Sequence, residues 1–429
     1  MSMSRWVVAL TATACVVSGC TAHDPTETPP DATEQEHDAS RSKDVNRLSD
    51  VGDGNALKGL LPCIESGTHC LAQKKACVVT DDGNEQCETC PKGHYPSPLT
   101  ALCIPLEGTP IAHEFAEMTL APGEEIASVC QTWILGNDEE IWVSAVEFEN
   151  GGGYHHSNWV FVPEGYNGWK TEPWPNCYAE GFNEGVAGLI GGVLFAQSTQ
   201  AENELQKFRS GAAIRIPPRS QIMAPTHLLN YQPKTLTTHL RLTIYTIPAT
   251  DVVTKLTPIV LTNRALAIPK QSTSEFRADC DFNDTHETFL GVPLNAKLHY
   301  ALPHYHNRAV RFRLAIFGGD KDGETIFEDS GFGLEPFGRL FDPPVDLAGA
   351  KGLTFSCVYE NESNKKVTWG IGDREMCDML GFVESPASLI GFVEEGTMTQ
   401  LEDGSYLHTG SCAASSVEFD QAKDGGDVP

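Results

Sequence analysis

The chain is short of positive charge. Its 429 residues include 30 lysines and arginines against 58 aspartates and glutamates, which gives a formal net charge of −28. A surface with this balance repels a phosphate backbone, so the composition argues against nucleic-acid binding. The hydrophobic content of 40% and the aromatic content of 8% are those of an ordinary soluble protein with room for two or three domains.

Long apolar runs are also scarce. Beyond the N-terminal region, no segment has the roughly 18 consecutive apolar residues that a membrane helix needs. The run Trp6–Val17 follows Arg5 and ends in Val17-Ser18-Gly19-Cys20. This pattern resembles a bacterial lipoprotein signal, residues 1–19, with lipid attached to Cys20; an ordinary secretory signal is the alternative. We expect an exported protein, anchored by lipid at the outer membrane or cell surface.

Large apolar residues are almost missing from residues 20–60, so this segment is expected to be a disordered tether. The next segment, residues 61–107, is too short for an adequate core, and its six cysteines predict a disulfide-rich module. Their spacing loosely resembles EGF-like modules. A zinc site at Cys87-x-x-Cys90 is the alternative, although it lacks a matching second pair. The six cysteines are Cys63, Cys70, Cys77, Cys87, Cys90 and Cys103.

Helical periodicity is rare in the remainder, where apolar and polar residues alternate in short runs such as Ile141–Phe148 and Leu236–Tyr245. We therefore predict an all-β fold with two consecutive jelly-roll-like β-sandwich domains, residues 108–252 and 253–416. An acidic tail follows at 417–429.

Two pairs of histidines stand out in these blocks. His304 and His306 are two residues apart, so on an extended strand they share a face and form half of a metal site. His155 and His156 are neighbours and would face opposite sides of a regular strand. The preceding glycines, Gly151–Gly153, allow a bulge that turns both inward. For each pair, surface-exposed histidines without a metal are the alternative.

Two single histidines are treated differently. His227 lies between the two pairs and is a candidate third ligand. His239 lies with the polar set of an alternating strand and is expected to face solvent.

The ordered set His155-His156, His227, His304-x-His306 and Glu375-Met376-Cys377 resembles the copper type II ascorbate-dependent monooxygenases. This family includes peptidylglycine α-hydroxylating monooxygenase and dopamine β-monooxygenase, and the resemblance covers roughly residues 108–415. It implies two coppers per chain. One, bound by His155, His156 and His227, relays an electron; the other, bound by His304, His306 and Met376, activates oxygen. Imidazole suits copper in both oxidation states, and a thioether favours Cu(I).

The resemblance further implies radical hydroxylation of a C–H bond in a small organic substrate, using O2 and ascorbate or another small reductant. His304, His306 and Met376 would be the catalytic residues, and an electron would cross a solvent-filled gap between the domains. A monomer is expected. The implied disulfides are Cys357–Cys377, Cys280–Cys412 and Cys130–Cys177.

The candidate substrate pocket departs from the peptide-amidating members. Leu302 replaces their carboxylate-binding arginine, and Asp378 and Leu380 replace an asparagine and a tyrosine. A peptidyl-glycine substrate is therefore not expected, and Asp378 could favour a cationic amine or simply lie exposed on the sandwich rim. Two other functions stay open: a copper-handling lipoprotein without catalysis, and an adhesive protein that binds no copper.

Overall fold

The computed structural model describes residues 67–80, 82, 84–97, 100–166, 176–197, 200–330, 338–370 and 373–418. The predicted signal, the predicted lipidation site Cys20, the predicted tether and nearly all of the acidic tail lie outside this range. Within it, no helix combines the length and the apolar composition needed to cross a bilayer.

The cysteine-rich module is a short helix followed by two small hairpins. Disulfides join Cys70 to Cys87 and Cys90 to Cys103, and Cys77 is disulfide-bonded as well. Both cysteines of Cys87-x-x-Cys90 are thus used in bridges, so the alternative of a zinc site there is wrong. The elements are α1 Gly67–Ala72, β1 Ala76–Val79, β2 Glu85–Glu88, β3 His94–Pro96 and β4 Cys103–Pro105.

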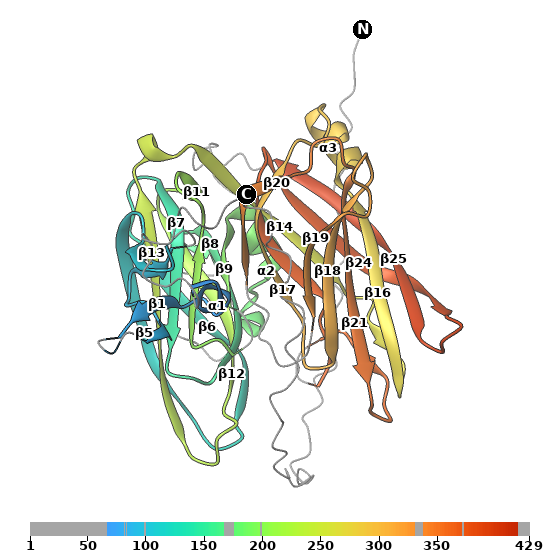
Figure 1. Ribbon diagram of the computed structural model, residues 1–429, viewed down its shortest axis with the longest axis horizontal. Helices are drawn as coiled ribbons and strands as arrows, with labels where there is room; N and C mark the ends of the chain where they lie inside the picture. Colours follow the sequence, from blue (N-terminus) through green and yellow to red (C-terminus); the bar gives the residue numbers. More distant parts are fainter. Residues whose placement is uncertain are drawn as a thin grey trace. The chain divides into compact units, whose positions relative to one another are not determined.

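The first large block is a sandwich of two sheets (Figure 1). Strands β11, β7, β13 and β5 lie side by side in one sheet, with β10 on β7, and β6, β12, β8 and β9 form the other. Large side chains such as Phe148, Trp159 and Phe161 alternate inward and fill the space between them. The elements are β5 Thr109–Leu120, β6 Glu125–Ile134, β7 Ile141–Asn150, β8 Tyr154–Pro163, η2 Tyr178–Glu180, α2 Glu184–Ile190, β9 Gly192–Ala196, β10 Asn203–Lys207, β11 Ala212–Ile216, β12 Ser220–Leu229, β13 Leu236–Ile247 and η3 Ala249–Asp251.

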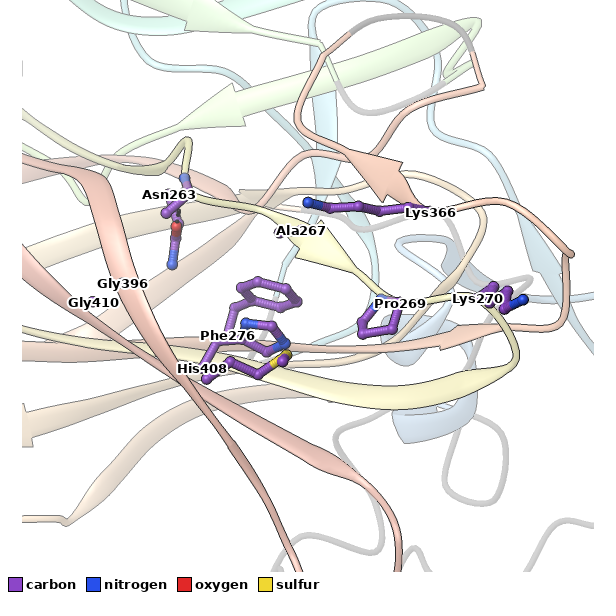
Figure 2. A pocket seen from close by; sticks show the side chains of 11 residues that line it. Asn263, Ala267, Pro269, Lys270, Phe276, Lys366, Gly396, His408 and Gly410 are labelled. Carbon is purple, nitrogen blue, oxygen red and sulfur yellow. Dashed lines mark hydrogen bonds between the residues drawn. The ribbon is translucent and has the colours of Figure 1, made fainter.

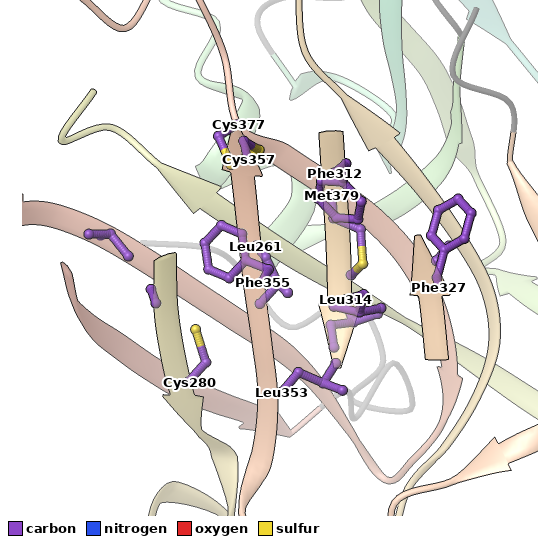
Figure 3. Close-up of a cluster of buried hydrophobic side chains, with 14 of the residues drawn as sticks. Leu261, Cys280, Phe312, Leu314, Phe327, Leu353, Phe355, Cys357, Cys377 and Met379 are labelled. Carbon is purple, nitrogen blue, oxygen red and sulfur yellow. A yellow bond between two sulfur atoms is a disulfide. The ribbon is translucent and has the colours of Figure 1, made fainter. Parts of the chain in front are cut away.

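The second large block has its own core. Figure 3 shows Phe312, Leu314, Phe355 and Met379 packed in it, beside the Cys357–Cys377 disulfide. The elements are β14 Thr254–Asn263, β15 Ala267–Ile268, β16 Ser272–Asp281, α3 Phe282–Leu290, β17 Lys297–His304, β18 Ala309–Phe317, β19 Thr325–Ser330, β20 Arg339–Asp346, β21 Gly352–Asn361, β22 Val367–Thr368, β23 Asp378–Glu384, β24 Ala387–Gln400 and β25 Tyr406–Glu418.

A shared sheet joins the two blocks. Strand β11 pairs in parallel with β14, from Ala212 opposite Thr254 to Ile214 opposite Leu256. Two aromatic side chains of the second block, Tyr300 and Phe382, are buried in the core of the first. The structure therefore confirms the predicted all-β class, with jelly-roll-like sandwiches behind a disulfide-rich module. The exact domain limits stay predictions.

Candidate metal centre

The first histidine set lies on two neighbouring strands. In the β8–β12 ladder His156 pairs with His227, and the register shifts next to that pair, so His155 is an extra residue on β8. Gly152 and Gly153 just before it have positive φ angles of 87° and 79°, which other residues rarely adopt. The irregularity brings both neighbouring rings close to His227, at centroid distances of 5.0 Å for His155 and 4.9 Å for His156.

Hydrogen bonds orient this set. His227 Nε2 lies 2.7 Å from Glu125 Oε1, and because a carboxylate accepts, this nitrogen carries the proton. His227 Nδ1 is then left with a lone pair, 3.1 Å from His156 Nε2. Two nitrogens this close can both bind one ion at metal–nitrogen distances of about 2 Å. The third ring, His155, has Gln200 Nε2 at 3.4 Å from its Nδ1.

The second set begins at the end of a strand. His304 closes β17, where it pairs with Asp378 of β23, and His306 lies in the turn that follows. His306 Nδ1 donates to the Arg374 carbonyl over 2.7 Å, which leaves its Nε2 with a lone pair. That Nε2 is buried, with no hydrogen-bond partner among the described residues.

A buried carboxylate holds this turn. Glu375 is 0% exposed and accepts from the backbone N–H of His306 at 2.9 Å and of Arg308 at 2.8 Å. Met376, next in the chain, is buried too, and its carbonyl accepts from the Tyr359 hydroxyl. The Cys357–Cys377 disulfide fixes the following residue. The Met376 segment is thus tied directly to the His306 turn.

The two sets are in contact with each other. The rings of His156 and His304 have centroids 5.2 Å apart, and those of His155 and His306 are 6.4 Å apart. One nitrogen from each of His156, His304 and His306 lies within 4.8 Å of the others. The solvent-filled gap implied by the resemblance is therefore absent between these rings. The β11–β14 pairing and the shared core hold the two blocks together.

Burial keeps these rings neutral. It lowers the pKa of His155 to about 4 and that of His304 to about 3, with neighbouring imidazoles adding to both shifts. The pKa values of His156 and His306 are lowered by burial as well. Burial also raises the pKa of Glu375 to about 7, against the opposing effect of its two backbone donors. Neutral imidazoles are the form that binds metals.

The donor set fits copper. It consists of five imidazoles drawn together in a partly buried cluster, one buried nitrogen lone pair without a partner, and a thioether on an adjoining segment. Imidazole serves zinc, copper, iron and nickel alike, whereas a thioether selects Cu(I). The rings of His155, His156 and His227 lie close enough together to share one ion.

The residues expected to line the substrate pocket lie in different environments. Leu302 is only 2% exposed and lies in the first hydrophobic core, where Leu380, its cross-strand partner, also packs. Asp378 is half-buried opposite His304. His239 is exposed, as its place in the alternating pattern predicts.

Sequence reasoning missed two carboxylates that position the histidines. Glu375 could have been suspected from its place in Glu375-Met376-Cys377, but a glutamate beside a candidate ligand has many possible roles. Glu125 carries no local signal, because it is one of several glutamates and lies far from His227 in the chain.

The comparisons with known proteins leave the function open. No protein-family model matches the chain, and no curated protein does so. Similar solved structures include PBCV-1 VP54 fitted into a reconstruction of the virophage Sputnik, at 8% identity and a TM-score of 0.23, covering 64% of this chain and 94% of that one. Another is the major capsid protein P2 of bacteriophage PM2, at 7% identity and a TM-score of 0.27, covering 64% and 97%. Likenesses this weak say nothing about the histidine cluster.

Proposed function

We propose that the protein is a copper-dependent monooxygenase that hydroxylates a C–H bond of a small organic substrate with O2 and a small reductant such as ascorbate. The observation that carries the proposal is the presence of two histidine sets, His155, His156 and His227 on β8 and β12, and His304 and His306 beside the Met376 segment. These residues come from distant parts of the chain, so the tertiary fold brings them together and not the conformation of one loop. The protein would act outside the cytoplasm, anchored through Cys20.

Copper would supply the redox chemistry and the activation of O2. The chain contributes the placement of the donors. Glu125 orients His227, and the Arg374 carbonyl fixes the tautomer of His306, so that one ring nitrogen of each faces the cluster. Burial keeps the imidazoles neutral and ready to bind.

A copper-handling protein without catalysis is the second candidate. The observation in its favour is the direct contact between the rings of His156 and His304, which lets a single ion be shared by the two blocks. Such a site would retain copper without separate relay and reaction centres.

The test is the copper stoichiometry of the full chain, compared with Met376→Ala and with Met118→Ala, a partly buried methionine that is not among the proposed ligands. Two coppers per chain, with Cu(I) binding weakened at one site only in Met376→Ala, support the monooxygenase. Oxygen uptake that depends on both substrate and reductant completes the case. One copper per chain without such uptake favours copper handling, and no copper above background overturns both.

A further inference from the structure

The second block contains a pocket that shares no residue with the histidine cluster. It has a volume of about 470 Å³, within the range of pockets that bind small organic molecules. Its walls come from β15, the segments beside it, β16, and the long β24–β25 hairpin. Gly396 and Gly410 are paired in that hairpin and both lie in the pocket wall.

An imidazole and an aromatic ring lie together in this pocket. His408 stacks on Phe276 with ring centroids 3.9 Å apart and planes 13° apart, as Figure 2 shows. His408 is 7% exposed, and its Nε2 is buried without a hydrogen-bond partner among the described residues. Burial, with a smaller effect of nearby Lys366, lowers the pKa of His408 to about 4, so the ring is neutral at pH 7. A buried polar atom of this kind is costly unless something pairs with it.

The charge around the pocket has the opposite sign to the rest of the chain. Two lysines, Lys270 and Lys366, lie among the lining residues, and none of the lining residues is an aspartate or glutamate. This is unusual in a chain in which acidic residues outnumber basic ones by 58 to 30. Over the described residues, neither lysine has a carboxylate within ion-pair distance.

We infer that this pocket binds a small amphipathic organic anion, a carboxylate on an apolar body. The apolar body would lie against Met398 and the alanines of the wall. The carboxylate would be held at the mouth of the pocket by the ammonium group of the exposed Lys270 or Lys366. This site is separate from the proposed copper centre and does not depend on it.

The test is calorimetric titration of the metal-free full chain with 2-naphthoate, beside its uncharged analogue 2-naphthalenemethanol. We expect one molecule of naphthoate per chain and much weaker binding of the alcohol. Lys270→Gln with Lys366→Gln should weaken naphthoate binding by about tenfold or more, because charge-assisted contacts are lost. Lys365→Gln, an exposed neighbour outside the pocket, should leave it unchanged.

One further variant locates the binding. His306→Ala disrupts the histidine cluster and should have no effect. The inference is overturned if naphthoate does not bind at millimolar concentration, if the double lysine variant binds it as tightly as the parent, or if His306→Ala abolishes binding.

Discussion

The two histidine sets reach the same place by different structural means. His155, His156 and His227 are carried by a pair of hydrogen-bonded strands, with a bulge at His155 beside a glycine run and a register shift against β6 at His227. His304 and His306 lie where a strand gives way to a turn, and the turn is held by the buried carboxylate of Glu375 and by a disulfide. In the first set the sheet backbone places the residues and Glu125 only orients one ring, whereas the second set needs a buried side chain and a disulfide to hold its turn.

Removal of the Glu375 side chain should have the largest effect on stability and on copper binding. Glu375→Ala leaves the N–H groups of His306 and Arg308 buried without an acceptor, and should lower the free energy of unfolding by about 3–5 kcal/mol. Copper binding at the second set should weaken with it. Chemical denaturation of the metal-free chain measures the first effect. Glu328→Gln, on the exposed side of β19, is the control. A loss below 1 kcal/mol would show that the carboxylate is not what holds the turn.

Removal of the disulfide beside Met376 should have the second-largest effect on stability. Replacing Cys357 and Cys377 together by alanine opens a loop with a sequence separation of 20 residues, and should cost about 3 kcal/mol. We expect Cu(I) binding at the second set to weaken, while the first set is unaffected. The double replacement of Cys130 and Cys177 is the matched comparison, since that bridge lies in the first block. If loss of the Cys130–Cys177 disulfide weakens Cu(I) binding as much as loss of the Cys357–Cys377 disulfide, the second histidine set does not depend specifically on its own disulfide.

Acid should destabilise the metal-free protein through both sets together. The folded pKa values of about 4 for His155 and about 3 for His304 lie below the ordinary 6.5, so the unfolded chain binds more protons as the pH falls. Stability is therefore full above about pH 7 and declines as the pH falls from 6.5 towards 4.

Glu375 opposes this trend, because its raised pKa of about 7 lets the folded state take up a proton first. More histidines with lowered pKa values contribute than this one carboxyl, so we expect the stability to decline overall as the pH falls. Thermal unfolding between pH 7 and pH 4 measures it. His155→Gln with His304→Gln should flatten the slope, and an unchanged slope would mean that other groups cause it.

The smallest effect should follow Glu125→Gln. Glu125 is 45% exposed, so its loss should hardly change stability. It orients His227, however, and the loss of such an orienting partner typically lowers metal affinity by about 10-fold or more. Copper titration should show weakening at the first set only. If the second set weakens equally, the two sets act as one site.

The sequence could supply the elements of this centre but not its assembly. Alternating apolar residues were sufficient for the all-β class, and the glycines before His155 indicated the bulge. Nothing in either block indicated that β11 would pair with β14, because strand pairing between distant segments leaves no local pattern. For the same reason the sequence could not show that Leu302, a candidate for a substrate pocket, would instead be buried in the core of the first block.

The spread of the ligands along the chain has a consequence for how the centre is made. His156 lies early in the first block, whereas the turn of His306 is complete only when Glu375, near the end of the second, is in place. Contacts between such distant segments form late in folding. An ion held jointly by His156 and His306 therefore needs a chain that has folded through both blocks. The free energy of metal binding would stabilise only the fully folded chain. Only fully folded chains would therefore retain the ion.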